Sequence, residues 1–133
     1  MSALSDIIAR LEKATGPDRD VDAHIALATG WLVLGTNIGP EWCDPNNRPA
    51  GLPAYTASLD AALRLVPEGW GGSVDVYPES YRRPDADGKR LKWGGAASIS
   101  PDFGDIARLI TACAKTPALA LCIAALKARE ASA

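Results

Sequence analysis

Apolar residues recur at helical spacing near the C-terminal end of the chain, in residues 116 to 130. Thr116 is a suitable N-cap, because its hydroxyl can accept an unpaired amide of the first turn, and Pro117 fits the first helical position. Leu121 and Ala125 widen the apolar face, so we expect this helix to be buried on more than one side and the rest of the chain to pack around it. The face recurs at i, i+3, i+4 and i+7 and comprises Leu119, Cys122, Ile123 and Leu126.

The same periodicity predicts three shorter helices nearer the N-terminus. They cover residues 3 to 14, about 19 to 29, and 56 to 66. Either Asp18 or Asp20 is expected to cap the second of these helices, and Thr56 the third. The expected apolar faces are Leu4, Ile7, Ile8 and Leu11 in the first helix, Val21, His24, Ile25 and Ala28 in the second, and Leu59, Ala62, Leu63 and Val66 in the third.

Alternating apolar and polar residues predict a two-stranded hairpin in the second half of the chain. The first strand covers residues 73 to 77 and the returning strand residues 90 to 99, with Asp87-Gly88 suited to the turn between them. Gly94-Gly95 is expected to mark a bulge or bend in the second strand. The inward-facing residues are expected to be Val74 and Val76 in the first strand and Leu91, Trp93, Ala97 and Ile99 in the second.

Two further segments fit more than one structure. Residues 105 to 115 fit either a helix or a third strand, and the strand is favoured because an extended connection suits the approach to Thr116. Residues 31 to 34 either extend the second helix or form a short strand. A long, turn-rich loop follows over residues 35 to 54. Trp42 lies in it and either pins the loop to the core or contacts a ligand; pinning is favoured.

The composition describes an ordinary globular domain of 133 residues, 47% hydrophobic and 23% charged. A net charge of −2 makes nucleic acid an improbable partner, because non-specific binding to the phosphates of a nucleic acid needs an excess of Lys and Arg. No apolar run approaches the length of a membrane span, and the first residues lack a signal-peptide pattern. We therefore expect a cytoplasmic protein without a membrane partner. Three cysteines without CxxC spacing favour free thiols over a disulfide framework.

The residues needed for familiar catalytic sites are missing. His24 is the single histidine, and its position on the predicted apolar side of a helix favours a core or boundary role over a catalytic one. One histidine leaves little for a zinc site, and neither GxxxxGK[ST] nor GxGxxG occurs in a suitable place. An enzyme is therefore disfavoured, and we assign no catalytic residue, no cofactor and no metal ligand.

Three segments together resemble a known family. They are Asp22-Ala-His-Ile-Ala-Leu-Ala28 with Gly30-Trp31, the segment from Pro53 to Trp70, and the segment from Thr116 to Arg129. In this order they resemble the small phage and prophage proteins grouped as the phage ABA-sandwich domain. The resemblance implies a phage or prophage origin and a layered α/β/α domain over residues 1 to 133. It implies no catalytic residues. The fold class expected is α+β, with a small antiparallel sheet of two to four strands packed by about four helices.

Aromatic and basic side chains gather around the predicted hairpin. Aromatic faces stack on bases, and Arg or Lys pairs with phosphates. Such a cluster could bind a small anionic ligand such as a nucleotide, or face a protein partner. The alternative is that the tryptophans belong to the core and the charges to a solvated hairpin. The candidate ligand-binding residues are Trp42, Tyr77, Tyr81, Arg82, Arg83, Arg90, Lys92 and Trp93.

These observations favour a non-enzymatic binding protein. In its most concrete form, a phage-encoded protein in the host cytoplasm sequesters a nucleotide signal of an antiviral defence system, with a homo-oligomer left open as a way to close the pocket. The alternatives are a direct inhibitor of a host defence effector or nuclease, and a small enzyme whose site cannot be recognised in the sequence.

Overall fold

The computed structural model of the chain describes residues 3–76, 94–101 and 106–132. The described residues confirm a small single-domain α+β fold, with four α-helices and five strands in two antiparallel sheets. The elements are α1 (Ala3–Lys13), α2 (Arg19–Ala28), β1 (Leu32–Thr36), β2 (Gly39–Cys43), α3 (Leu59–Leu63), β3 (Gly71–Val76), β4 (Gly95–Ser100), a 3₁₀ helix η2 (Ile106–Arg108), β5 (Ile110–Ala114) and α4 (Pro117–Ser132).

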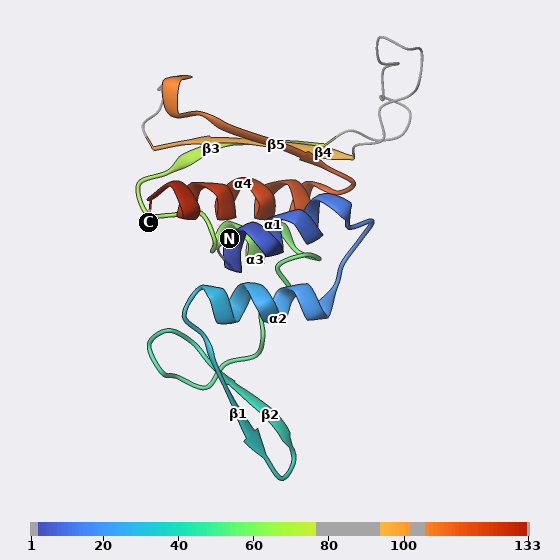
Figure 1. Cartoon of the computed structure of the whole chain (residues 1–133), viewed down its shortest axis with the longest axis vertical. Helices are drawn as coiled ribbons and strands as arrows, with labels where there is room; N and C mark the ends of the chain where they lie inside the picture. Colours follow the sequence, from blue (N-terminus) through green and yellow to red (C-terminus); the bar gives the residue numbers. More distant parts are fainter. Residues whose placement is uncertain (1–2, 77–93, 102–105, 133) are drawn as a thin grey trace.

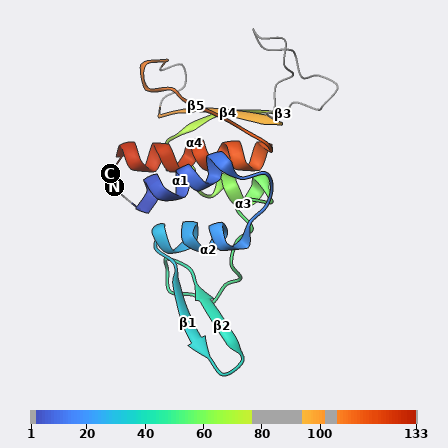
Figure 2. The ribbon, with the colours of Figure 1, turned by 45° about the vertical axis from the view of Figure 1, so that its right-hand side comes forward.

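The elements are stacked in layers from one end of the molecule to the other (Figures 1 and 2). The three-stranded sheet lies at one end, α4 runs beneath it, α1 and α3 follow, and α2 comes next. The β1–β2 hairpin projects from the opposite end, beyond α2. The domain is therefore a body of helices and one sheet with a single protruding arm.

The three-stranded sheet has the order β3-β4-β5. Val74 pairs with Ala97, and Ala97 pairs with Ala112 on its other side. These residues face α4, and the buried Ile99 belongs to the same core cluster. The inward orientation expected for Val74, Ala97 and Ile99 is confirmed. The inward orientation predicted for Val76 is wrong: this residue lies at the end of an edge strand, and 61% of it is exposed.

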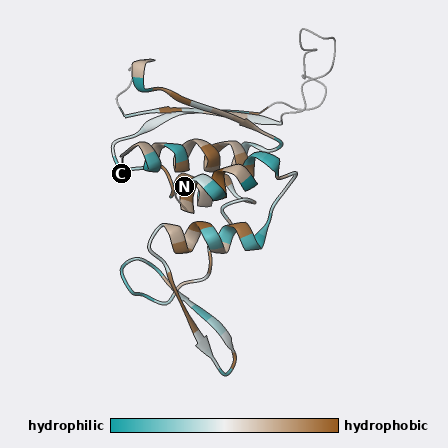
Figure 3. Cartoon of the chain, viewed as in Figure 1, coloured by the Kyte–Doolittle hydropathy of each residue, from teal (hydrophilic) through white to brown (hydrophobic). Residues whose placement is uncertain are grey.

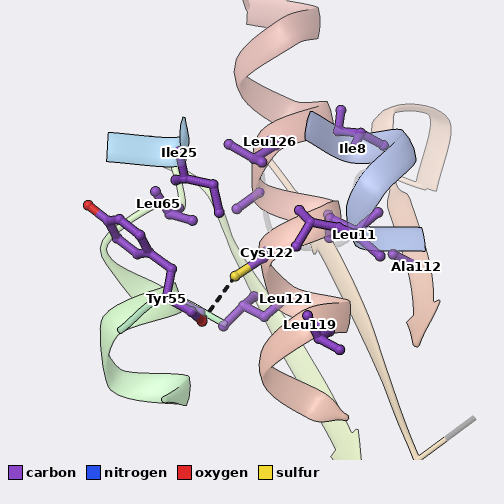
Figure 4. Packing of buried hydrophobic residues seen from close by; sticks show 14 of the residues in the cluster. Ile8, Leu11, Ile25, Tyr55, Leu65, Ala112, Leu119, Leu121, Cys122 and Leu126 are labelled. Carbon is purple, nitrogen blue, oxygen red and sulfur yellow. Dashed lines mark hydrogen bonds between the residues drawn. The ribbon is translucent and has the colours of Figure 1, made fainter. Parts of the chain in front are cut away.

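Helix α4 is the centre of the core. Its residues are buried from Ala118 through Leu126, which agrees with the expectation that it is covered on more than one side. Figures 3 and 4 show its apolar residues between the sheet and the other helices. Thr116 caps the helix as predicted: its hydroxyl accepts the amide of Leu119 at 3.2 Å. The local sequence and the packing thus agree along this helix.

The third helix begins later than predicted. Ser58 is its N-cap and accepts the amide of Ala61, whereas Thr56 is buried and its backbone amide and hydroxyl both bind the Asp22 carboxylate. Because the chain stays irregular up to Ser58, the helical face is rotated. Leu59 and Leu63 are exposed, and the buried positions are Ala62 and Leu65.

The second helix is capped by Asp18, one of the two predicted caps. Its buried stripe includes Asp22, which is drawn inward by Thr56. His24 is consequently exposed rather than on the apolar side. Its Nδ1 lies 2.9 Å from the carbonyl oxygen of Asp20 and 3.1 Å from Nη1 of Arg10. The core or boundary role predicted for His24 is therefore wrong.

Of the predicted bulge or bend at Gly94-Gly95, the structure has the bend: the chain bends at Gly94, just before β4 begins. Gly95 stands in a regular ladder, opposite Val76 on one side and Ala114 on the other. A Cβ atom at Gly95 would lie 2.5 Å from the Cα of Pro117. Glycine is required here because the first turn of α4 passes directly against the backbone of β4.

Two ambiguous segments are strands. Residues 31 to 54 contain the β1–β2 hairpin rather than a continuous loop, with Leu32 opposite Cys43. Residues 110 to 114 form β5, as favoured from the sequence. The turn predicted at Asp87-Gly88 and the inner positions predicted for Leu91 and Trp93 lie outside the described residues.

Candidate anion-binding site

Of the ligand-binding residues predicted from the sequence, Trp42 is the one that lies within the described residues. Tyr77, Tyr81, Arg82, Arg83, Arg90, Lys92 and Trp93 lie outside the described residues. Trp42 is half-buried on β2 and packs against the main core cluster. Its position agrees with the pinning role, in which the tryptophan holds its segment to the body of the protein.

A different pocket collects the features of an anion site. It has a volume of about 200 Å³ and lies where the end of α2, the start of β1, the end of α3 and the last turns of α4 meet. Two of its side chains are arginines from separate helices, and two are aromatic. The lining residues are Thr29, Trp31, Pro45, Tyr55, Arg64, Leu65 and Arg129.

Arg129 is held in place by the end of α3. Its Nε donates to the carbonyl oxygen of Leu65 at 2.6 Å, and its Nη2 donates to that of Arg64 at 3.5 Å. Carbonyls just beyond a helix C-terminus carry the negative end of the helix dipole, so a guanidinium is favoured there. A guanidinium has five N–H donors in a fixed fork. These two bonds therefore orient Arg129 and leave further donors for a ligand.

Arg64 supplies the second positive charge. It is the C-cap residue of α3, and its side chain is exposed. Among the described residues, Arg19 forms an ion pair with Asp22 at 3.1 Å, which leaves Arg64 and Arg129 out. No carboxylate is among the residues that line the pocket. The two guanidinium groups of Arg64 and Arg129 are therefore the charged groups among the described residues that line the pocket.

Tyr55 forms the floor between the arginines and the core. It is almost fully buried, and its carbonyl oxygen accepts the Cys122 thiol at 3.2 Å (Figure 4). Burial raises the pKa of the Tyr55 phenol, and this rise is opposed by polar interactions with Thr29 and Trp31 and by the positive charges of Arg129 and Arg64. The phenol is therefore a neutral group near two cations.

Two larger hollows suit an anion less well. One, of about 420 Å³, lies along β3 and is mostly apolar, with Glu68 as its charged residue. The other, of about 450 Å³, lies between α1 and α2. Its cation Arg10 contacts His24, and the hollow also contains Asp6. Glu68 and Asp6 would each repel an anion. A further hollow, of about 280 Å³ beside the start of α4, has no cationic side chain among its described lining residues. Among these hollows the smaller pocket, with its two arginines, is therefore the candidate.

Sequence reasoning missed this pocket for a physical reason. In the sequence, Arg64 is explained as a residue on the solvent-exposed face of its helix. Arg129 is explained as a cation in the last turn of its helix, where it interacts with the negative end of the helix dipole. Each residue is fully explained by its own helix. Only the packing of α3 on α4 places the two guanidinium groups at one pocket, and no local pattern encodes that packing.

The thiol of Cys122, behind Tyr55, leads to a prediction about alkaline stability. Burial, and then the charge of Asp22, raise its pKa from 9.0 to about 12. Above pH 9 the unfolded chain releases this proton while the folded chain keeps it, so the free energy of unfolding should fall between pH 9 and 12. Cys122→Ser keeps a donor to Tyr55 but does not titrate there. We expect the variant to show a shallower loss of stability than the wild type in urea unfolding at pH 8 to 11, and parallel curves would contradict the assignment.

No family model, curated protein or solved structure matches the chain. The resemblance to the phage ABA-sandwich domain therefore stays a prediction. Among the described residues, no helix has the length and apolar character of a membrane span. The same residues contain no cluster of three or more His, Cys, Asp or Glu side chains suited to a metal ion.

Proposed function

We propose that this chain is a binding protein that takes the anionic group of a small ligand between Arg64 and Arg129. The observation that carries the proposal is the meeting of two guanidinium groups at one pocket whose described lining contains no carboxylate. Arginine forks match the oxygens of phosphate and carboxylate groups, and such bonds are stronger than neutral ones. The expected ligand class is a nucleotide or another small phosphorylated compound.

The size of the pocket limits what enters it. A volume of about 200 Å³ is below the range of pockets that enclose a whole drug-sized ligand. It suits a phosphate or carboxylate group, with the remainder of the ligand outside. A second copy of the chain could cover that remainder, and a homo-oligomer thus belongs to this proposal.

The finer form of the proposal is the sequestration of a nucleotide signal of host defence by a phage-encoded protein in the host cytoplasm. It is supported by the resemblance stated from the sequence and by the absence of a recognised catalytic set. Binding without turnover distinguishes it from an enzyme. A sequestering protein should return its ligand intact after denaturation.

The first experiment is a thermal-shift screen of the full chain against linear and cyclic nucleotides, with the uncharged nucleosides as matched controls. A ligand at 100 times its dissociation constant adds about 2.7 kcal/mol to the free energy of unfolding. For a domain of this size that raises the melting temperature by several degrees. A shift with a nucleotide, none with its nucleoside, and recovery of the intact ligand would support the proposal.

Variants then locate the site. Arg64→Ala should weaken binding by about tenfold or more, because a charged hydrogen-bond partner is lost. Arg129→Lys keeps a positive charge but loses the fork, and should also weaken binding. Arg108→Ala removes an exposed arginine on η2 and is the control, with unchanged affinity expected. The comparison of affinities holds if each variant, without ligand, melts at the same temperature as the wild type.

A second pair of variants tests the site predicted from the sequence. The double variant Arg82→Ala/Arg83→Ala removes two arginines of the cluster predicted from the sequence. If this double variant abolishes binding while Arg64→Ala does not, the ligand binds at residues 77 to 93 and the assignment to the Arg64–Arg129 pocket is wrong. If no member of the panel shifts the melting temperature, small-ligand binding is wrong and a protein partner becomes the next hypothesis. Capture of a stoichiometric partner from host lysate would then follow.

A further inference from the structure

Strand β1 and the tip of the β1–β2 hairpin form an apolar arm that the rest of the described chain leaves uncovered, whereas Trp42 and Cys43 at the base of β2 pack against the body. The hairpin projects beyond α2 in both views, and Figure 3 shows apolar residues along it (Figures 1 to 3). Every residue of β1 is exposed. Its large side chains are Leu32 (56% exposed), Val33 (41%) and Leu34 (53%), and Ile38 at the tip is 99% exposed. An isolated two-stranded hairpin is only marginally stable in water.

The two edges of this hairpin differ. The outer edge of β2 is partly occupied by its own chain: the carbonyl oxygen of Trp42 accepts the amide of Ala50, and the amide of Asp44 donates to Arg48, both at 2.9 Å. Pro40, which has no N–H, and the charged Glu41 protect the rest of it. The outer edge of β1 has no proline and no charge, and no described strand pairs with it.

The register shows which groups the open edge presents. The N–H and C=O groups of Trp42 point away from β1, because its carbonyl oxygen accepts the amide of Ala50. Val33 lies opposite Trp42 in a non-hydrogen-bonded pair, so the N–H and C=O groups of Val33 point away from β2. Gly35, opposite Pro40, does the same by alternation. Val33 and Gly35 thus offer two N–H and two C=O groups separated by Leu34. This arrangement is self-complementary under a two-fold axis.

We infer that β1 is a dimerisation strand, which pairs antiparallel with β1 of a second copy of this chain. With Leu34 on the two-fold axis, Val33 of each copy faces Gly35 of the other and four backbone hydrogen bonds form. The two hairpins then make one four-stranded sheet, in which the Leu34 side chains of the two copies lie side by side and remove part of each other's exposed apolar surface. A second copy fits better than an unrelated partner because the uncharged edge satisfies its own donors and acceptors, as two-fold interfaces require.

Sedimentation velocity of the full chain over about 1 to 100 µM tests the inference, since dimers of moderate affinity dissociate in this range. We expect a concentration-dependent dimer. Leu34→Lys places like charges side by side at the axis and should weaken dimerisation by at least about tenfold. Leu63→Lys makes the same change at an equally exposed position on α3 (54%) and should leave the dimer unchanged. A wild type that stays monomeric, or a dimer that survives Leu34→Lys, would overturn the inference.

A cross-link tests the register separately. Across a non-hydrogen-bonded antiparallel pair the Cα atoms lie about 4.5 Å apart, which is within disulfide reach. In a Cys113→Ser background, where the remaining cysteines are buried, Leu34→Cys should form a disulfide-linked dimer under mild oxidation. Ile38→Cys is more accessible, but its two copies would lie more than about 20 Å apart and should not cross-link. The reverse pattern would contradict the proposed pairing.

Discussion

Replacing Asp22 by alanine is expected to lower the free energy of unfolding by about 3 kcal/mol, because it leaves a buried donor without a partner. Asp22 is fully buried on α2. One carboxylate oxygen accepts the backbone amide and the hydroxyl of Thr56, each at 2.8 Å, and the other accepts Nη1 of Arg19 at 3.1 Å. Without the carboxylate, the Thr56 amide faces the core with no acceptor. The hydroxyl retains only a 3.2 Å contact with the carbonyl oxygen of Asp18.

Two further variants separate the causes of this loss. Asp22→Asn keeps an oxygen that can accept from Thr56 but removes the charge, so its effect should be smaller, about 1 kcal/mol. Asp20→Ala removes a carboxylate from the same first turn, where it is exposed, and should cost no more than about 0.5 to 1 kcal/mol through the helix dipole. Urea unfolding at pH 7 measures all three. Equal effects of Asp22→Ala and Asp20→Ala would show that only the helix dipole matters.

The Asp22–Thr56 link also explains where sequence reasoning succeeded and failed. Thr116 caps α4 by a contact between residues three apart, and the apolar spacing that follows is local, so both were predictable. Thr56 had the same local appearance as a cap. It instead serves a residue 34 positions earlier in the chain, and Ser58 takes over the cap. Local patterns cannot decide between a cap and a distant partner.

The same limit applies to sheets and to the candidate site. The alternation around Val74 and Ala97 predicted which side faces the core, because a strand repeats every two residues. The alternation could not reveal why position 95 must be glycine. The reason is that the backbone of Pro117 lies against it and leaves no room for a Cβ atom. Arg129 meets the carbonyls of Arg64 and Leu65 across about half the chain. Periodicity therefore establishes faces, while the pocket depends on which faces meet.

Removing the side chain of Leu126 tests whether α4 is the centre of this domain. Leu126 is fully buried and belongs to the same core cluster as Ile8 and Ile25 (Figure 4). Leu126→Ala should lower the free energy of unfolding by about 2 to 5 kcal/mol, since both apolar burial and packing contacts are lost and α1, α2 and α4 cannot all close the cavity. A domain of this size has only about 5 to 15 kcal/mol of stability in total. The variant is therefore expected to melt well below the wild type.

Leu63→Ala is the matched control, because it makes the same chemical change on α3 where 54% of the side chain is exposed. It should change the free energy of unfolding by no more than about 0.5 kcal/mol, as surface substitutions usually do. Chemical denaturation followed by tryptophan fluorescence can report both variants, because Trp31 is buried in the same core cluster. If Leu126→Ala proved as mild as Leu63→Ala, α4 would not be packed between the sheet and the helices as described. If it is several-fold more damaging, then the layers on both sides of α4 depend on its packing, including the floor of the Arg64–Arg129 pocket.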